Sequence, residues 1–271
     1  MDFELLSKVK TSDKLCDKHK VNLVSVGNVQ PFCTMCRKEM IEDQEKKIVE
    51  EAFKADRRRK TVEVLERDSI INDVGLWKAS FDNYETSNPE TEAALKQARI
   101  AAGEYLRSFE GNYTTGFNTL FSGVPGAGKS HLAMSMLKAV NEHSKTKVSC
   151  LFVSVNDLFR LIKSSFGKPD SKYTELNMTE LLAKVDLLVL DDLGSEASFK
   201  RDNREASEYV QNVLFGILNA RERTIITTNL NSEQLEMIYN PKIISRMYKN
   251  VSGHIIKFTS ATSDKRTKIE F

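Results

Sequence analysis

Residues 123–130 read Gly-Val-Pro-Gly-Ala-Gly-Lys-Ser, and no other stretch constrains the fold of this chain so tightly. They complete the pattern G-x-x-x-x-G-K-[ST], in which glycines let backbone N–H groups come close to phosphate oxygens. Residues 118–122 form a short apolar stretch that predicts a strand, and residues 131–140 carry apolar side chains at helical spacing. A strand, this loop and a helix in succession predict a nucleoside triphosphate as the ligand.

Each part of this loop has a predicted role. The pattern indicates that Lys129 reaches the β- and γ-phosphates and that the hydroxyl of Ser130 binds Mg²⁺. The helix that follows directs the partial positive charge of its N-terminus at the same anion. The alternative is a chance match in a glycine-containing turn, which the flanking strand and helix disfavour. The residues expected to contact the nucleotide are Gly123, Val124, Pro125, Gly126, Ala127, Gly128, Lys129, Ser130 and His131.

A second motif places two carboxylates at the end of a predicted buried strand. The apolar run 185–190 leads into Asp191 and Asp192, and ligands of open α/β sheets lie at the carboxyl ends of the strands. We expect Asp191 to hold Mg²⁺ and Asp192 to orient or deprotonate the attacking water, the arrangement called Walker B. A pair that merely caps a strand is the alternative. The predicted strand 224–229 ends in Asn229, which is well placed to touch the γ-phosphate or the attacking water.

From about residue 77 onward, predicted strands and helices alternate, which is typical of an α/β fold with a mostly parallel sheet between helices. Cys150 lies in the predicted strand 148–154, where a buried small apolar side chain is favoured over a reactive thiol. Residues 204–223 predict an amphipathic helix, whose apolar stripe we assign to the core instead of a groove for a partner.

Near the N-terminus, the segments Cys16-x-x-His19 and Cys33-x-x-Cys36 form two ligand pairs. Two pairs at this spacing predict a closed zinc site with a structural role, because four protein ligands leave no position for a reacting water. The intervening residues 20–32 are expected to fold back as a hairpin or knuckle. Zinc also stabilises a segment whose apolar surface is too small to offset the ordering of its backbone. Unrelated free thiols or a redox pair are the alternatives.

Residues 40–68 are rich in charge and contain no proline or glycine, which predicts a long solvent-exposed helix. Its basic cluster at residues 57–60 is either a contact for nucleic acid phosphates or a solvated face, and we favour the solvated face. The predicted organisation is a zinc-binding module over residues 1–40, a charged helical linker over residues 41–76 and a nucleotide-binding domain over residues 77–271.

Composition sets only outer limits on the function. A chain of 271 residues is long enough for one or two domains, and a formal net charge of +2 gives no overall argument for nucleic acid. The first residues lack the apolar core of a secretory signal, and no apolar run approaches membrane-spanning length. We therefore predict a cytoplasmic protein that has no membrane partner and whose unligated cysteines are reduced.

Several segments together resemble one protein family. They are residues 80–84 (Ser-Phe-Asp-Asn-Tyr), residues 123–133 (Gly-Val-Pro-Gly-Ala-Gly-Lys-Ser-His-Leu-Ala) and residues 186–194 (Asp-Leu-Leu-Val-Leu-Asp-Asp-Leu-Gly). In these segments the chain is similar to the AAA+ ATPases of the DnaC/DnaI replicative helicase-loader family, with the IstB-type transposition ATPases as close relatives. The resemblance covers residues 77–271 and implies a AAA+ core with a minimal or absent lid.

The resemblance also implies roles for two arginines. Residues 243–247 resemble the box that supplies an arginine finger, so Arg246 is expected to act on the ATP of a neighbouring protomer. Arg266 lies near the position of the family's sensor II arginine, which contacts the nucleotide. Residues 195–223 stand where the family has the insertion that steers protomers into a helical array. The chain departs from many AAA+ proteins at Asp192, where glutamate is common, and the shorter side chain predicts slow turnover.

Together with the zinc ligands, the resemblance predicts ATP, Mg²⁺ and Zn²⁺ as cofactors and three kinds of partner. The N-terminal region is expected to bind a DnaB-type replicative helicase, and the AAA+ domain is expected to bind single-stranded DNA and further copies of itself. The candidate DNA contacts, which combine cations with an aromatic residue, are Lys163, Phe166, Lys168, Lys200 and Arg201. As an alternative, Phe166 is a packed residue at a helix end.

Three other functions compete with the helicase loader. An IstB-like transposition or DNA-targeting ATPase is the first, and the zinc module favours the loader over it. A metabolic kinase is the second, and the Arg246 box and the strand that ends in Asn229 argue against it. A module that binds ATP without turning it over is the third, and only a measurement of hydrolysis separates it from an ATPase.

Overall fold

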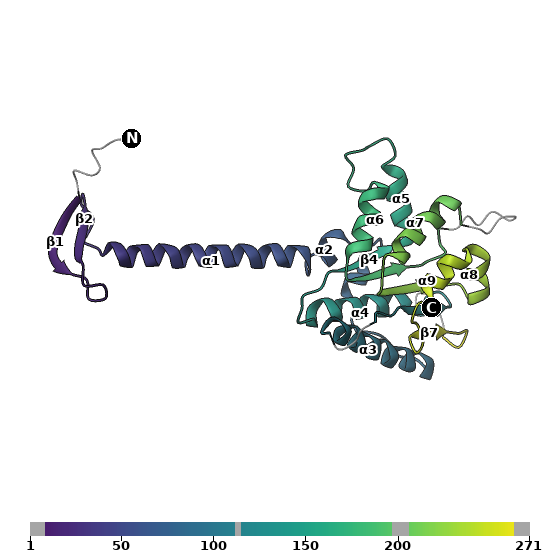
Figure 1. Cartoon of the computed structure of the whole chain (residues 1–271). Helices are drawn as coiled ribbons and strands as arrows, with labels where there is room; N and C mark the ends of the chain where they lie inside the picture. Colours follow the sequence, from purple (N-terminus) through teal and green to yellow (C-terminus); the bar gives the residue numbers. More distant parts are fainter. Residues whose placement is uncertain (1–8, 112–114, 197–205, 263–271) are drawn as a thin grey trace, which may run out of the picture. The chain divides into compact units, whose positions relative to one another are not determined.

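The computed structural model describes residues 9–111, 115–196 and 206–262. The chain forms two compact units, Met1–Arg57 and Arg58–Phe271, whose elements are labelled in Figure 1. The sequence predicts a linker that ends at residue 76, whereas the second unit of the structure already begins at Arg58. None of the described helices combines the length and the apolar character that a membrane span needs. The cytoplasmic location stays a prediction.

The N-terminal unit contains a two-stranded sheet and a long helix (Figure 1). Strands β1 (Val9–Leu15) and β2 (Asn22–Val26) pair in antiparallel fashion. Val24 and Phe32 then exchange backbone hydrogen bonds of 2.8 and 2.9 Å, so the chain between the two ligand pairs folds back as predicted. Helix α1 (Thr34–Lys60) follows, and it has no buried residue.

The predicted helix over residues 40–68 is wrong at its start and in its continuity, although α-helical structure does end at Asp68. Helix α1 already begins within the zinc module, and a turn over residues 61–63 separates it from α2 (Val64–Asp68). The break has a physical cause, because Val64 and Leu65 are each only 4% exposed and pack into the cores of the second unit. A straight continuation of the solvated helix would leave both side chains in water.

The second unit is built on a five-stranded parallel sheet in the order β4-β5-β6-β3-β7. The strands are β3 (Thr119–Gly123), β4 (Cys150–Ser154), β5 (Leu187–Asp191), β6 (Thr224–Thr228) and β7 (Ile255–Phe258). Alternate side chains of β5 enter two separate cores, with Leu188 on one face and Val189 on the other. The sheet therefore lies between two helical layers, which confirms the α/β prediction.

Helices cover both faces of this sheet (Figure 1). On one face lie α3 (Pro89–Phe109) and α4 (Lys129–His143), and on the other lie α5 (Val155–Ser164), α6 (Glu175–Lys184) and α7 (Glu208–Asn219). The short helices α8 (Ser232–Ile238) and α9 (Pro241–Met247) follow β6. The apolar stripe of α7 is buried, which confirms that it belongs to the core. The predicted start of this helix at residue 204 lies outside the described residues.

A short extended segment after α2 brings the chain to the carboxyl edge of the sheet. The N–H of Ile70 donates to the carbonyl of Phe152, and the carbonyl of Ile70 accepts from the N–H of Ser154, both at 2.9 Å. This segment thereby extends the sheet beyond β4. The 3₁₀ helix η2 (Val74–Lys78) follows directly, so residues 73–76 are fixed beside the ends of the strands.

A buried arginine connects the end of α6 to the start of β6. Arg221 is 5% exposed. Its guanidinium donates to the carbonyls of Leu182, Val185 and Arg223, at 2.5, 2.8 and 2.9 Å. A further bond, of 3.3 Å, joins its Nε to the hydroxyl of Thr224. The carbonyls at the end of α6 therefore depend on this side chain for their donors.

We predict that Arg221→Met lowers the free energy of unfolding of the second unit by about 3 kcal/mol, because it leaves buried carbonyls without donors. Arg99→Met is the matched control. Its guanidinium is half exposed and pairs with an exposed carboxylate, so a change below about 0.5 kcal/mol is expected. Urea unfolding followed by the fluorescence of Trp77, the single tryptophan, measures both. Equal midpoints for the two variants would contradict the role assigned to Arg221.

Candidate functional site

A cavity of about 470 Å³ lies at the carboxyl edge of the sheet, beside the ends of β3, β5 and β6. The lining residues are Asp73, Gly75, Leu76, Gly126, Gly128, Lys129, Ser130, His131, Asp191, Asp192, Thr227 and Asn229. Both predicted motifs and the predicted asparagine thus contribute to one cavity. The volume suits a small ligand of nucleotide size.

The loop between β3 and α4 requires glycine at two close approaches. Gly123 has φ of 120°, and a Cβ atom there would lie 1.8 Å from the carbonyl oxygen of Phe258. Gly128 has φ of 91°, and its Cβ would lie 2.6 Å from the ring of Tyr84. The Tyr84 hydroxyl also donates to the carbonyl of Ala127 at 3.0 Å. Neighbouring elements therefore fix the conformation of the loop, and Gly126, Gly128 and Ser130 of the loop line the cavity.

Lys129 lies almost completely buried at the start of α4, and its ammonium has partners within the protein. Nζ donates to the carbonyls of Gly123 and Val124 at 2.9 and 2.7 Å and to Oδ1 of Asn229 at 2.7 Å. The amide of Asn229 donates in turn to Oδ1 of Asp192 at 2.7 Å. A continuous chain of hydrogen bonds therefore joins the phosphate-binding loop to the second carboxylate.

The two carboxylates have different surroundings. Asp191 is 8% exposed, and burial raises the pKa of its carboxyl group, while hydrogen bonds from the hydroxyls of Thr227 and Ser130 oppose this rise. The Thr227 bond measures 2.7 Å. Asp192 is more exposed and has φ of 57°, in the left-handed region. Asp191 and Ser130 thus offer a carboxylate and a hydroxyl oxygen side by side, the kinds of ligand that Mg²⁺ takes.

Sequence reasoning missed several residues that line the cavity. Thr227 holds Asp191 through its hydroxyl and also accepts the backbone N–H of Asp192 at 2.9 Å. Its sequence signal is limited to its position, one residue before the end of β6. Asp73 accepts the N–H of Gly75 at 2.8 Å, and with Leu76 it forms a wall of the cavity. No motif marks these residues, because the pairing of Ile70 with β4 places them there.

Other predicted residues do not line the cavity. Four residues of the loop do not line it: Gly123, Val124, Pro125 and Ala127, the last of which is fully buried. Arg246 lies on α9, where it borders a different cavity. Phe166 follows α5, is 60% exposed and meets the ring of Tyr209 edge-on, with 6.1 Å between the ring centroids. It therefore has an aromatic neighbour at the surface but is not a buried core residue. Lys163 and Lys168 are exposed beside it. Three predicted residues, Lys200, Arg201 and Arg266, lie outside the described residues.

The four predicted zinc ligands converge in the N-terminal unit. Their ligand atoms all lie within 4.8 Å of one another. The Sγ atoms of Cys16 and Cys36 are 3.6 Å apart, and Nδ1 of His19 lies 3.2, 3.6 and 3.9 Å from the sulfurs of Cys36, Cys33 and Cys16. Tetrahedral zinc with bonds of about 2.3 Å to sulfur separates two sulfurs by about 3.8 Å. The spacing of the four atoms therefore fits zinc.

The surroundings of this cluster also fit a metal site. Nε2 of His19 lies 3.0 Å from Oε1 of Glu39, so its Nδ1 is the nitrogen that faces the sulfurs. Lys18 pairs with the other oxygen of Glu39 at 2.5 Å. The backbone N–H of His19 lowers the pKa of the Cys16 thiol to about 6, whereas the hydrogen bond with Cys16 raises the pKa of the Cys36 thiol to about 11. In the absence of a metal, Cys16 is therefore the sulfur that ionises first. Cys150, in contrast, is fully buried in β4, and burial raises the pKa of its thiol.

The parallel sheet, the phosphate-binding loop after β3 and the carboxylates at the end of β5 define a AAA+-like ATP-binding protein. The chain belongs to the family described as IstB-like ATP binding protein, which matches residues 51–257. The cluster of Cys16, His19, Cys33 and Cys36 lies outside the matched residues.

Relatives of known sequence and structure agree with this assignment. The uncharacterized protein YdaV of Escherichia coli strain K12 is 31% identical over 202 residues, which cover 72% of this chain and 73% of YdaV. The replicative helicase loader DnaC of the same strain is 29% identical over 168 residues. That match spans 62% of each protein, less than two thirds of the length of DnaC. The crystal structure of DnaI, at 24% identity, shares the fold with a TM-score of 0.53 and covers 70% of this chain and 95% of that one.

We predict that Glu39→Ala weakens zinc binding about 10- to 100-fold, because the partner that orients a ligating histidine is lost. Glu50→Ala changes an exposed glutamate of the same helix and is expected to leave zinc affinity unchanged. Competition with a chromogenic chelator measures the affinity of both variants. An unchanged affinity for Glu39→Ala would show that the ring of His19 is held without this carboxylate.

We predict that Asp191→Asn raises the free energy of unfolding of the nucleotide-free protein at pH 7. Because the folded pKa of Asp191 is raised, the folded state holds its proton more tightly than the unfolded state, and stability declines as pH rises through the interval between the two pKa values. The variant's advantage in unfolding free energy over the wild type is complete above this interval. It disappears below the unfolded pKa of about 3.9, where the wild-type carboxyl group is protonated in both states. Urea unfolding over a pH series tests this, and a variant less stable than the wild type at pH 7 would contradict it.

Proposed function

We propose that this protein is an ATP-dependent DNA replication protein that binds a replicative helicase of the DnaB type and loads it onto single-stranded DNA. The observation that carries the proposal is a zinc-type module in a unit separate from the ATP-binding core and outside the segment shared by the family. A loader needs one part that grips a protein and another that responds to nucleotide. The similarity to the replicative helicase loader DnaC supports the same proposed function.

The cavity at the sheet edge supports ATP hydrolysis. Lys129 and the backbone of residues 123–130 would bind the phosphates, and Ser130 and Asp191 would hold Mg²⁺, whose charge would stabilise the transferred phosphoryl group. Asp192, held by the Asn229 amide, orients the attacking water. The carboxylate of aspartate reaches less far than that of glutamate, so we propose slow turnover.

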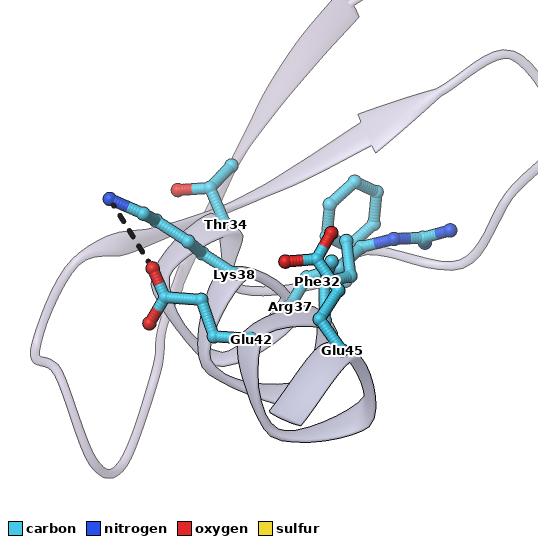
Figure 2. A pocket seen from close by; sticks show the side chains of 7 residues that line it. Phe32, Thr34, Arg37, Lys38, Glu42 and Glu45 are labelled. Carbon is cyan, nitrogen blue, oxygen red and sulfur yellow. Dashed lines mark ion pairs between the residues drawn. The ribbon is translucent and has the colours of Figure 1, made fainter. Parts of the chain in front are cut away.

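The N-terminal unit offers a surface for the helicase. A groove of about 460 Å³ lies at the start of α1. Figure 2 shows its lining side chains, among which Arg37 lies over the ring of Phe32 and Lys38 pairs with Glu42. The apolar side chain of Ile41, which is 45% exposed, lines the same groove. An exposed apolar centre with a charged rim is the usual anatomy of a protein interface.

Single-stranded DNA is the second proposed partner. Phe166 is 60% exposed, and Lys163 and Lys168, which flank it in the sequence, are exposed as well. Base stacking on an aromatic ring together with cations for the backbone is the usual mode of binding single strands. Lys200 and Arg201 remain proposed contacts by resemblance alone.

The second candidate function is an IstB-like transposition ATPase, whose partner is a transposase. The family described as IstB-like matches residues 51–257, which supports this candidate as well as the loader. The partner of the N-terminal unit is the discriminating property. Binding of a transposase in place of a replicative helicase would favour this second function.

We predict that Ile41→Glu abolishes binding of a DnaB-type helicase to the full chain, because a charge in the groove opposes burial of its apolar centre. Ile48→Glu is the matched control, since Ile48 is 65% exposed on the same helix but does not line the groove. Both variants should retain zinc and ATP binding. Co-sedimentation with the purified helicase measures the effect, and equal binding by both variants would exclude the groove as the helicase contact.

We predict that Arg246→Ala lowers the rate of ATP hydrolysis about 10³-fold, because a neighbouring copy no longer supplies a cation to the γ-phosphate. The affinity of the monomer for ATP should not change, because Arg246 does not line its own cavity. Steady-state hydrolysis over a range of protein concentrations, with and without single-stranded DNA, measures the effect. Wild-type activity that is independent of concentration would contradict a shared site.

A further inference from the structure

We propose that Asn219 is a positioning residue for Arg246, and that the groove beside these two residues receives the rim of the phosphate cavity of a second copy of this chain. This inference rests on the proposed action of Arg246 on a neighbouring nucleotide. Neither the family match nor the motifs assign a role to Asn219, which lies at the end of α7.

The first observation is the way in which the guanidinium of Arg246 is held. Its Nε donates to Oδ1 of Asn219 at 2.8 Å. In the part of the chain that the structure describes, neither Nη atom has a hydrogen bond or an ion pair with another residue. One amide therefore fixes the plane of the guanidinium while both terminal nitrogens stay available. This fork matches two oxygens of a phosphate.

The second observation is the way in which the backbone of Arg246 is held. The amide of Asn118 donates to the carbonyls of Arg246 and Met247 at 2.9 and 3.2 Å, and it accepts the N–H of Thr224 at 3.0 Å. Asn118 is 4% exposed and directly precedes β3. The end of α9 is thereby bound to the edge of the sheet at which β3 and β6 begin.

The location of this attachment decides which phosphate Arg246 can contact, that of its own chain or that of another copy. The phosphate cavity lies at the opposite edge, after Gly123, and the five residues of β3 between the two edges span about 16 Å. The guanidinium is also tethered to α7 through Asn219. A phosphate that reaches the open fork therefore comes from another copy.

The third observation is a groove of about 420 Å³ beside Arg246. Its lining residues are Phe215, Pro241, Lys242, Ser245 and Arg246. Two of them are cations and none is acidic. The phosphate cavity is mixed in character, since Lys129 and His131 line it together with Asp73, Asp191 and Asp192. A nucleotide phosphate at its rim would meet cations and no carboxylate in the groove. Groove and cavity are different surfaces of one chain, so their contact is heterologous.

A mixing experiment separates the subunit that gives the arginine from the subunit that holds the nucleotide. The acceptor is the full chain with Arg246→Ala, whose phosphate cavity is intact. The donor is the full chain with Lys129→Ala, which keeps Arg246 but lacks the phosphate-binding lysine. Three donors are compared: Lys129→Ala alone, with Asn219→Ala, and with Asn212→Ala. Asn212 is an exposed asparagine of the same helix, and Asn212→Ala is the matched control.

The expected result is that the first and third donors restore ATP hydrolysis by the acceptor, while the donor with Asn219→Ala restores roughly 10- to 100-fold less, the usual effect of misplacing a catalytic group. The KM for ATP of the acceptor should be the same with all three donors. Sedimentation should show that Asn219→Ala does not reduce assembly, whereas Lys242→Glu, which reverses a charge of the groove, does.

Each other outcome overturns a defined part of the proposal. Equal restoration by all three donors would exclude a positioning role for Asn219 and leave the shared site intact. A changed KM, or a lower unfolding midpoint for Asn219→Ala alone, would show that Asn219 is a structural residue. Full assembly of Lys242→Glu would exclude the groove as the interface. Unimpaired hydrolysis by Arg246→Ala without any donor would instead reject the proposed function of Arg246 itself.

Discussion

The position of β6 between β3 and β5 is the constraint on which the candidate nucleotide site depends. Parallel pairing places Ser122 beside Thr228 and Leu190 beside Ile226. The loop after β3, the amide after β6 and the carboxylates at β5 therefore reach one edge at the same level. Each further strand between them would add about 4.8 Å, more than a hydrogen bond spans. The chain of bonds from Lys129 to Asp192 exists because of this strand order.

Short sequence patterns predict those strands and site residues whose position is set by their neighbours along the chain. Apolar runs identify four strands of the sheet, and the glycines and acidic residues next to them identify most of the cavity. What the patterns miss depends on contacts between distant segments. Asp73 and Leu76 reach the cavity because Ile70 pairs with β4, and helix α1 ends because Val64 and Leu65 pack into the second unit. No property of these short segments, read alone, indicates either contact.

The two units reach stability by different means. The second unit buries two extensive apolar clusters against its sheet. Among the described residues of the first unit, only Cys16 and Cys33 are buried, and both are metal ligands in our interpretation. Such a unit has no apolar core to compensate for the ordering of its chain. The free energy of metal binding is then the free energy of folding, so the shape of the groove at the start of α1 depends on the metal.

The side chain of Asn229 has a consequence that follows from its chemistry. Its amide is a rigid plane with an acceptor at one end, bonded to Lys129, and a donor at the other, bonded to Asp192. A charged side chain of either sign would repel one of these neighbours. Because the plane turns as one body about a soft torsion, a rotation of this amide alters both hydrogen bonds together. The lysine of the loop and the second carboxylate are therefore coupled through one dihedral angle of Asn229.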